Sequence, residues 1–204
     1  MLLHEKLSPY HLILASASPR RRALLKDLGL TFSLAPNHDL EENYPDGMPA
    51  QDVPVYLAAR KSDTFVSGLN ENDILITADT IVILHGQIIG KPASKEEAVN
   101  MLSRLSGNTH TVITGVCLRT RSNQHCFSDR SEVIFRKLTE EEIRYYVDHY
   151  RPFDKAGAYG IQEWIGYVAI EEIRGSFYNV MGLPVQKLYI ELGKFADNLG
   201  KPAV

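Results

Sequence analysis

Residues 74–84 read Ile-Leu-Ile-Thr-Ala-Asp-Thr-Ile-Val-Ile-Leu. Branched side chains favour strands because they pack well on a pleated surface, so this run predicts one or two strands at the centre of a sheet. Asp79 lies inside the run, where a carboxylate is costly to bury unless it is paired, binds a metal ion or acts as a base. The same stretch therefore predicts the middle of the fold and a first candidate functional residue.

Shorter patterns on either side of this run predict alternating strands and helices. A strand at 11–15 leads into a helix at 20–28, which Pro19 begins. Serine or threonine followed three residues later by glutamate predicts the starts of two further helices, at Ser94 and Thr139. The remaining predicted strands are 31–35, 87–90, 111–119, 126–135 and 167–173, and the predicted helices are 53–69, 94–106, 139–150 and 185–195. This order predicts an α/β fold with a mixed, twisted sheet flanked by helices.

Composition limits the classes of protein to which the chain can belong. Its 204 residues are 44% hydrophobic, which is enough to bury a full core, and one domain over residues 1–204 is expected. A formal net charge of −3 with no basic stripe argues against a polymeric nucleic-acid partner. Because no run approaches about 20 apolar residues, no membrane segment is expected. The spacing of Cys117 and Cys126 is not that of a zinc or redox pair, which favours a reduced, cytoplasmic setting.

The start of the predicted helix at 20–28 has the features of an anion site. Two serines, Ser16 and Ser18, precede it, and three arginines occupy its first turn. Cations normally disfavour a helix amino terminus, so their placement is consistent with a bound polyphosphate that compensates them. The alternative is that Ser18 simply caps the helix while the arginines are solvated. The residues themselves leave both interpretations open.

Two lysines and one loop extend this list of candidates. Lys91 follows the turn after the central run, and Lys61 lies on the preceding predicted helix, where a lone lysine is more often a solvated residue. The loop at 151–162 combines an acid, a base, a phenol and an amide with small residues, so it can approach a ligand closely.

Five short motifs resemble the Maf family of nucleoside triphosphate pyrophosphatases, which are also known as septum-formation inhibitors. The resemblance runs in the family's order from about residue 12 to 195, nearly the whole chain. The motifs are Ser-Ala-Ser-Pro-Arg-Arg at 16–21, Ala-Asp-Thr at 78–80, Gly-Lys-Pro at 90–92, Asp-Lys-Ala-Gly-Ala-Tyr-Gly-Ile-Gln at 154–162 and Gly-Leu-Pro at 182–184.

The resemblance implies a fold, an assembly and a set of site residues. It implies two lobes around a deep cleft, an outline shared with the inosine triphosphate pyrophosphatases, and a homodimer. Asp79 matches the family's proton acceptor, and either Glu41 or Glu42 matches its metal-side carboxylate. A divalent cation, Mg²⁺ or Mn²⁺, would be bound by that glutamate together with Asp79. The positions that match polyphosphate contacts are Ser16, Arg20, Arg21, Lys61 and Lys91.

The resemblance also separates two substrate branches. The positions that distinguish the dTTP and UTP branch match Arg20, Thr80 and Gln162 here, whereas the 7-methyl-GTP branch departs at all three. The chain is thus expected to hydrolyse dTTP and UTP to the monophosphate and pyrophosphate, to limit non-standard nucleotides and to be linked to cell-division arrest. The alternatives are the 7-methyl-GTP branch, or a septum-associated binding protein that only senses nucleotide. The apolar surface that such a binding protein would need has as its nearest candidates Tyr145, Tyr146, Tyr150 and Phe153, which helix packing explains equally well.

Overall fold

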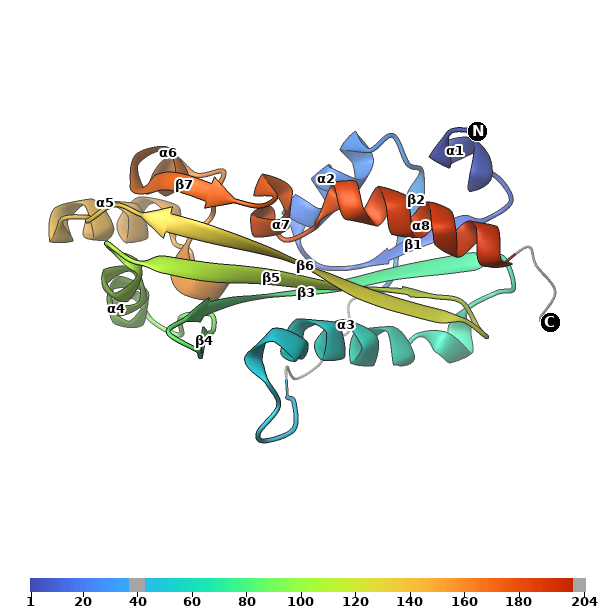
Figure 1. Cartoon of the computed structure of the whole chain (residues 1–204), viewed down its shortest axis with the longest axis horizontal. Helices are drawn as coiled ribbons and strands as arrows, with labels where there is room; N and C mark the ends of the chain where they lie inside the picture. The colour runs from blue at the N-terminus through green and yellow to red at the C-terminus, as the bar shows by residue number, and fades with distance from the viewer. Residues whose placement is uncertain (37–42, 200–204) are drawn as a thin grey trace. The chain divides into compact units, whose positions relative to one another are not determined.

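A computed structural model describes residues 1–36 and 43–199. Over these residues the strands form one seven-stranded sheet with the order β2-β1-β3-β5-β6-β7, and β4 pairs with β3 (Figure 1). The strands are β1 His11–Ala15, β2 Phe32–Leu34, β3 Asp73–Leu84, β4 Gln87–Ile89, β5 Thr109–Arg119, β6 Gln124–Phe135 and β7 Ile170–Arg174. The α-helices are α1 Leu3–Lys6, α2 Pro19–Asp27, α3 Val53–Asp63, α4 Lys95–Leu105, α5 Glu140–Tyr150, α6 Trp164–Ala169, α7 Phe177–Met181 and α8 Val185–Leu199.

The sheet is mixed, as the sequence predicts. Strand β1 runs parallel to β2 and β3, whereas β4 is antiparallel to β3 and β7 is antiparallel to β6. Nearly every residue of β3 is buried, which confirms that the run at 74–84 forms the centre of the sheet as one strand. An apolar run of this kind is expected for a strand that is covered on both faces.

The described residues divide into two compact units. Unit 1 holds residues 1–79, 114–129 and those from 182 onward, and unit 2 holds 80–113 and 130–181. Strands β3, β5 and β6 therefore each contribute residues to both units. The single domain and the cleft that the sequence led us to expect stay predictions.

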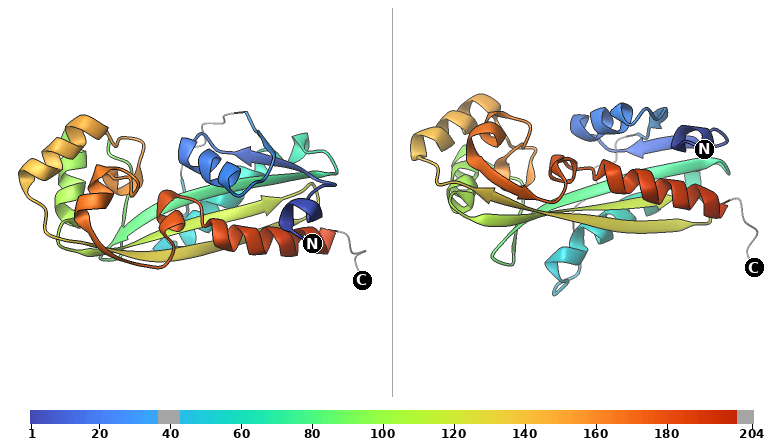
Figure 2. Two further views of the ribbon diagram at one scale, coloured as in Figure 1. Left: turned by 90° about the horizontal axis from the view of Figure 1, so that it is seen from above. Right: turned by 45° about the horizontal axis from the view of Figure 1, so that its top comes forward.

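In unit 1, helices cover both faces of the strands. Helices α2 and α8 lie on one side and α3 lies on the other, as the views in Figures 1 and 2 agree. For α2 and α3 this arrangement follows from the order β2-β1-β3. The crossover through α2 runs from β1 to β2 and the crossover through α3 runs back past β1 to β3, and right-handed crossovers in opposite directions place their helices on opposite faces. On the α8 side, Lys187 Nζ donates to the Ser128 carbonyl of β6 at 2.6 Å.

A close backbone approach fixes α3 against β5. A Cβ built on Gly115 would lie 2.3 Å from the carbonyl carbon and oxygen of Pro54, in the first turn of α3. No side chain fits in that space, so glycine is required here for contact between a strand and a helix.

We therefore expect Gly115→Ala to destabilise the protein by about 1–3 kcal/mol, the usual cost of overpacking a core. Urea denaturation followed by circular dichroism measures this change in the free energy of unfolding. Gly68→Ala is the matched control, because a Cβ at Gly68 meets no atom within 4 Å and its φ is not positive. Equal midpoints for Gly115→Ala and the parent would show that α3 can move away from β5 at little cost.

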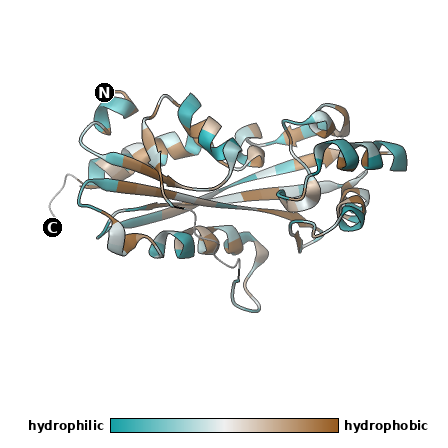
Figure 3. Ribbon diagram, turned by 180° about the vertical axis from the view of Figure 1, so that it is seen from behind, coloured by the Kyte–Doolittle hydropathy of each residue, from teal (hydrophilic) through white to brown (hydrophobic). Residues whose placement is uncertain are grey.

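In unit 2, the core lies between the sheet and helices α4 and α5. Its buried aromatic residues include Phe135, Tyr146 and Tyr159, with aliphatic side chains such as Leu102 and Ile143 from the two helices. Apolar residues concentrate in the strands, whereas the helices alternate between polar and apolar residues (Figure 3). This alternation is typical of helices with one face on a core.

The predicted helix starts are confirmed by their caps. The Ser18 hydroxyl accepts from the Arg21 N–H at the start of α2, and Ser94 accepts from the Glu97 N–H at the start of α4. At the start of α5, Thr139 and Glu142 form a complete capping box. These ends were predictable because a cap depends on residues only three positions apart.

The helix predicted over 53–69 is shorter in the structure. Helix α3 ends at Asp63, and a short 3-10 helix follows at Val66–Gly68. The Thr64 hydroxyl donates to the Lys61 carbonyl at 2.9 Å, which satisfies one of the carbonyls left open at a helix end. The apolar spacing that continues beyond residue 63 therefore does not reflect a continuous helix.

The strand predicted over 167–173 is wrong in its first half. Tyr167 belongs to α6, and β7 begins only at Ile170. Gly166 packs so closely on the Ile161 carbonyl that any Cβ would clash, and its N–H donates to the Glu163 carbonyl at 2.8 Å. Arg136 holds the end of the turn through hydrogen bonds to the carbonyls of residues 168 and 169. These tertiary contacts override the local preference for a strand.

Sequence analysis did not find α1 or α7, which are short helices. Among residues 1–36 and 43–199, no helix is long and apolar enough to cross a membrane. A 3-10 helix at Ala50–Asp52 directly precedes α3. Another, at Ala156–Ala158, interrupts the loop at 151–162.

Candidate active site

The structure brings Asp79 and Lys61 together in unit 1. Asp79 lies on β3 with 7% of its side chain exposed, and the Lys61 ammonium donates to its Oδ1. A buried carboxylate requires a partner of this kind, because its charge is otherwise poorly solvated. The pair therefore keeps a charged oxygen available at a position that is almost closed to water.

The placement of this pair follows from how side chains repeat along strand β3 and helix α3. The Thr77 hydroxyl donates to the Ala58 carbonyl at 2.7 Å, which ties β3 to α3. Asp79 is two residues beyond Thr77 on the same face of the strand, and Lys61 is three residues beyond Ala58 on the same side of the helix. The contact that ties the two elements thus also sets the Asp79–Lys61 pair.

Arg21 joins three of the sequence motifs within unit 1. Its Nε donates to the Gly182 carbonyl at 2.7 Å, and one terminal nitrogen donates to the Ala78 carbonyl at 2.9 Å. Ala78 immediately precedes Asp79, so the guanidinium holds the strand at the residue next to the carboxylate. The structure therefore gives Arg21 a positioning role, and its predicted contact with phosphate stays a prediction.

The start of α2 has features of both interpretations of its sequence, the simple serine cap and the anion site. Ser18 does cap the helix, and the Ser16 hydroxyl accepts from the Ser18 N–H at 3.2 Å. The arginines are not simply solvated, however, because all three are partly buried and Arg22 donates to the Ser16 carbonyl. Three cations at a helix amino terminus remain an arrangement that a bound anion would stabilise.

In unit 2, Gln162 has an unusual environment. Its Oε1 is buried, and among the described residues it finds no hydrogen-bond partner. A buried carbonyl oxygen without a donor costs about 1–3 kcal/mol, so such an atom indicates a missing partner. Of the other two candidates in this unit, Thr80 is half-buried on β3 and Lys91 is exposed just after β4.

A hydrogen-bonded network shapes the loop that carries Gln162. The Tyr146 hydroxyl of α5 accepts from the Gly160 N–H at 3.0 Å and donates to Glu163 Oε2. Lys155, which is 8% exposed, pairs with the other Glu163 oxygen at 3.1 Å and with Asp154 at 2.7 Å. Burial, together with the bond to Glu163, raises the pKa of Tyr146, so the hydroxyl keeps its proton. Residues on both sides of Gln162 are thus fixed.

Sequence reasoning missed Tyr146 and Glu163 as part of this loop. Of the two interpretations of Tyr146, an exposed apolar surface and helix packing, the structure contradicts the first because the residue is fully buried. The available signal was chemical, since a tyrosine on the buried face of a helix usually requires a hydrogen-bond partner. Its partner lies 17 residues away, which no local pattern reveals.

A second buried polar cluster supports the same loop. His110 Nε2 lies 2.8 Å from the Tyr159 hydroxyl, and Phe135 contacts both rings edge to face. Burial lowers the pKa of His110 to about 4, so the imidazole is neutral at pH 7. The cluster therefore contributes packing and one hydrogen bond rather than charge.

The expected metal-side carboxylates stay a prediction. Glu41 and Glu42 lie outside the described residues. Among the residues that are described, no group of three or more His, Cys, Asp and Glu side chains could hold a metal ion. Asp79 by itself fits Mg²⁺ or Mn²⁺ chemically, because these cations prefer carboxylate oxygens.

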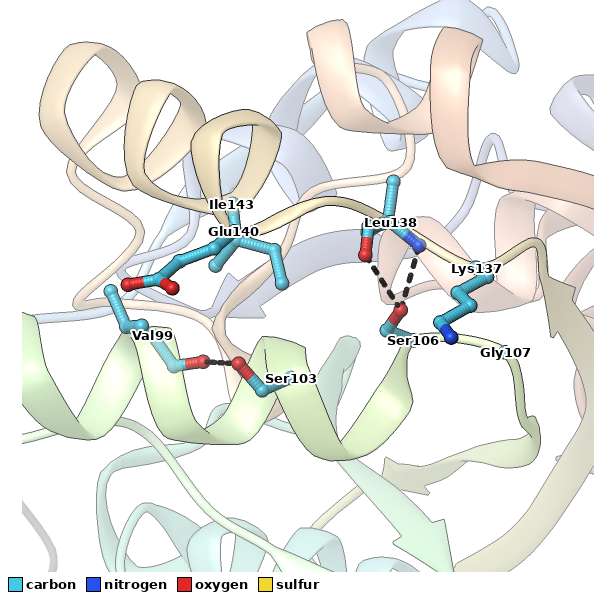
Figure 4. Close-up of a pocket in the computed structure, with 8 residues that line it drawn as sticks. All are labelled: Val99, Ser103, Ser106, Gly107, Lys137, Leu138, Glu140 and Ile143. Carbon is cyan, nitrogen blue, oxygen red and sulfur yellow. Dashed lines mark hydrogen bonds between the residues drawn. The ribbon is translucent and has the colours of Figure 1, made fainter.

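A pocket of about 500 Å³ lies elsewhere in unit 2, between α4 and the start of α5 (Figure 4). The Ser106 hydroxyl in this pocket exchanges hydrogen bonds with the Leu138 backbone, and the Ser103 hydroxyl donates to the Val99 carbonyl. Its hydroxyl groups are thus already satisfied by the protein. None of the predicted site residues lines it, so we do not assign the chemistry to this pocket.

Comparison with known proteins agrees with the motifs. The model of the family described as Maf-like protein matches residues 11–195. A dTTP/UTP pyrophosphatase from Parabacteroides distasonis is 52% identical over 191 residues, which cover 94% of this chain and 99% of that protein. A protein with the same name from Bacteroides thetaiotaomicron is 52% identical, and the match covers 92% of this chain and 97% of that protein. Another from Porphyromonas gingivalis is 50% identical, and the match covers 95% of this chain and 98% of that protein. The chain therefore belongs to the Maf-like family.

Proposed function

We propose that this chain is a nucleoside triphosphate pyrophosphatase, which hydrolyses dTTP and UTP to the nucleoside monophosphate and pyrophosphate. The observation that carries the proposal is the buried Asp79 carboxylate, paired with Lys61 inside the Ala-Asp-Thr motif of the family. Relatives that are about half identical over nearly their full length and are named dTTP/UTP pyrophosphatases support it. We place the activity in the cytoplasm, and a homodimer is part of the proposal.

In the proposed mechanism, Asp79 orients the attacking water and accepts its proton. The water oxygen forms a bond to the α-phosphorus while the bond from that phosphorus to the bridging oxygen breaks, and the electron pair leaves with pyrophosphate. Lys61 compensates the charge of the Asp79 carboxylate before the proton arrives. Ser16, the cations Arg20, Arg21 and Lys91, and the amino terminus of α2 bind the phosphates and neutralise the leaving group.

A divalent cation completes the proposed site. Asp79 and either Glu41 or Glu42 would hold Mg²⁺ or Mn²⁺, which adds positive charge at the phosphate oxygens when it is bound. The enzymatic proposal as a whole is tested by incubating the purified protein with dTTP and Mg²⁺ and measuring pyrophosphate. Release of inorganic phosphate instead, or no release at all, would contradict it.

The proposed selectivity for the base rests on Gln162. Uracil and thymine present a carbonyl oxygen beside a ring N–H, and one amide side chain can donate to the first and accept from the second. The buried Gln162 Oε1, which has no partner among the described residues, supports the accepting half of this pair. Cytosine presents an amino group beside an unprotonated ring nitrogen. The same amide orientation would therefore place donor against donor and acceptor against acceptor.

We expect UTP and dTTP to be hydrolysed well, and CTP and purine triphosphates roughly 5- to 150-fold more slowly. This range corresponds to about 1–3 kcal/mol for unpaired polar groups in a site. Values of kcat/KM for a panel of triphosphates that includes 7-methyl-GTP measure the preference. Equal values for CTP and UTP would contradict the role of Gln162 and leave the pyrophosphatase activity intact.

Gln162→Glu sharpens this test, because a carboxylate accepts hydrogen bonds but cannot donate them at neutral pH. We expect a selective loss of kcat/KM for UTP. Gln186→Glu on the exposed face of α8 is the matched control for the added charge. A uniform decrease for all triphosphates would indicate damage to the phosphate site rather than a change in base selection.

The alternative, a binding protein at the division septum, finds no support in the candidate tyrosines, all of which lie among the described residues. Tyr145 and Tyr150 are exposed, but Tyr145 already packs on Trp164 and His149, and Tyr150 stacks on Tyr146. These contacts are typical of helix packing. We therefore retain the enzymatic proposal.

A further inference from the structure

The two cysteines lie directly opposite each other on β5 and β6. The Thr120 N–H donates to the Asn123 carbonyl at 2.9 Å and closes the turn between these strands. Counting back from that pair along each strand places Cys117 opposite Cys126. Because hydrogen-bonded pairs alternate along an antiparallel ladder, this pair falls at a non-hydrogen-bonded position, where opposite Cα atoms are about 4.5 Å apart. That separation lies within the range of about 4.4–6.8 Å that a disulfide requires.

The side chains agree with this register. The two Sγ atoms are 2.6 Å apart, and both cysteines are free thiols with the Cys126 S–H directed at Cys117. A disulfide bond measures about 2.05 Å, so forming one here requires little movement of either strand. Cys117 also lies 3.5 Å from the Ser62 hydroxyl of α3. The pair is therefore held in place from the helix as well as from the hairpin.

The two sulfurs differ in their chemistry. The hydrogen bond from Cys126 lowers the pKa of Cys117 to about 7, and the same interaction raises the pKa of Cys126. When one of the two thiols ionises, the remaining proton is shared by two sulfurs, and near neutral pH the pair exists in both its neutral and its singly ionised form. Their exposure differs too, because Cys117 is buried whereas Cys126 is only half-buried. A reagent from solution therefore meets Cys126 first.

We propose that Cys117 and Cys126 are a modification site that forms a reversible intrachain disulfide with a low-molecular-weight disulfide, such as oxidised glutathione, as the oxidant. The shared proton moves to Cys117, and the Cys126 thiolate attacks one sulfur of the oxidant and displaces the first glutathione thiolate. Cys117 then gives its proton to that thiolate and attacks Cys126 Sγ, which displaces the second. The pair that shares one proton thus loses two electrons and that proton, and the oxidant leaves as one glutathione thiol and one glutathione thiolate, which takes a proton from water.

The test uses the reduced full-length protein under native conditions. After incubation with oxidised glutathione, we expect thiol titration in denaturant to find no free thiol. The intact mass should fall by two hydrogens, carry no glutathione and return to its starting value with dithiothreitol. In Cys117→Ser the second step is impossible, so one glutathione should stay on Cys126. In Cys126→Ser, the buried Cys117 should react at least tenfold more slowly.

Three results would overturn the proposal, two of them seen in the mass and thiol content and one on a gel. One is a lasting glutathione adduct on the parent protein, which would show that Cys117 cannot reach the mixed disulfide. Another is a parent that keeps both thiols over the time in which Cys117→Ser becomes modified. Intermolecular bonds would appear as a dimer on a non-reducing gel and would also contradict an intrachain site. These measurements on the parent decide the matter even if a variant fails to fold, and they do not depend on pyrophosphatase activity.

Discussion

Asp79→Asn is expected to lower kcat for dTTP hydrolysis by about 100-fold or more, because an amide cannot accept the proton of water. The substitution changes the size of the side chain very little, so the fold should persist. It removes the carboxylate charge that faces the partly buried Lys61 ammonium, and some loss of stability should accompany the loss of activity. Steady-state kinetics with dTTP and a thermal melt of the same preparation separate these two effects.

Asp63→Asn provides the matched control for this substitution. Asp63 ends α3, two residues after Lys61, and its side chain is 58% exposed. The same chemical change there should leave kcat within about twofold of the parent, as is usual for surface positions. If folded Asp79→Asn also turned over dTTP at nearly the parental rate, neither a base nor a metal ligand could be assigned to this residue.

Arg20→Ala and Lys91→Ala are each expected to lower kcat/KM roughly 30- to 1000-fold, which corresponds to a loss of about 2–4 kcal/mol of transition-state stabilisation. This is the usual loss when a charged contact to a transition state is removed. Arg20 lies in the first turn of α2, where a cation otherwise disfavours the helix, so Arg20→Ala should leave the melting temperature unchanged or slightly raised. Activity and stability would then move in opposite directions, which a merely structural residue does not produce.

Lys26→Ala is the control for loss of a cation from the same helix. Lys26 is exposed in the last turn of α2, where a positive charge suits the helix dipole, and its removal should not affect turnover. Should Arg20→Ala and Lys91→Ala both match the parent, the polyphosphate would have to bind elsewhere and the assignment of the motif at 16–21 would be wrong.

Local patterns predicted most of the elements and failed where distant residues decide the backbone. The cap of α2 at Ser18 was predictable because the cap and the N–H that it accepts from are three residues apart. The start of β7 was not, because Gly166 packs on the Ile161 carbonyl and Arg136 holds the end of α6. No pattern within residues 167–173 contains those contacts.

The sequence by itself determined the central strand, the family and the identity of the candidate residues. These follow from residue type and order, which need no knowledge of where the chain returns. Only the tertiary structure decided that Lys61 pairs with Asp79, that Arg21 holds the strand at Ala78, and that Cys117 faces Cys126. Each of these contacts depends on the register between two elements, and a shift of one residue in a strand would turn its side chains to the opposite face. Spacing along the chain does not contain that register, because it is set by the packing of the elements against one another.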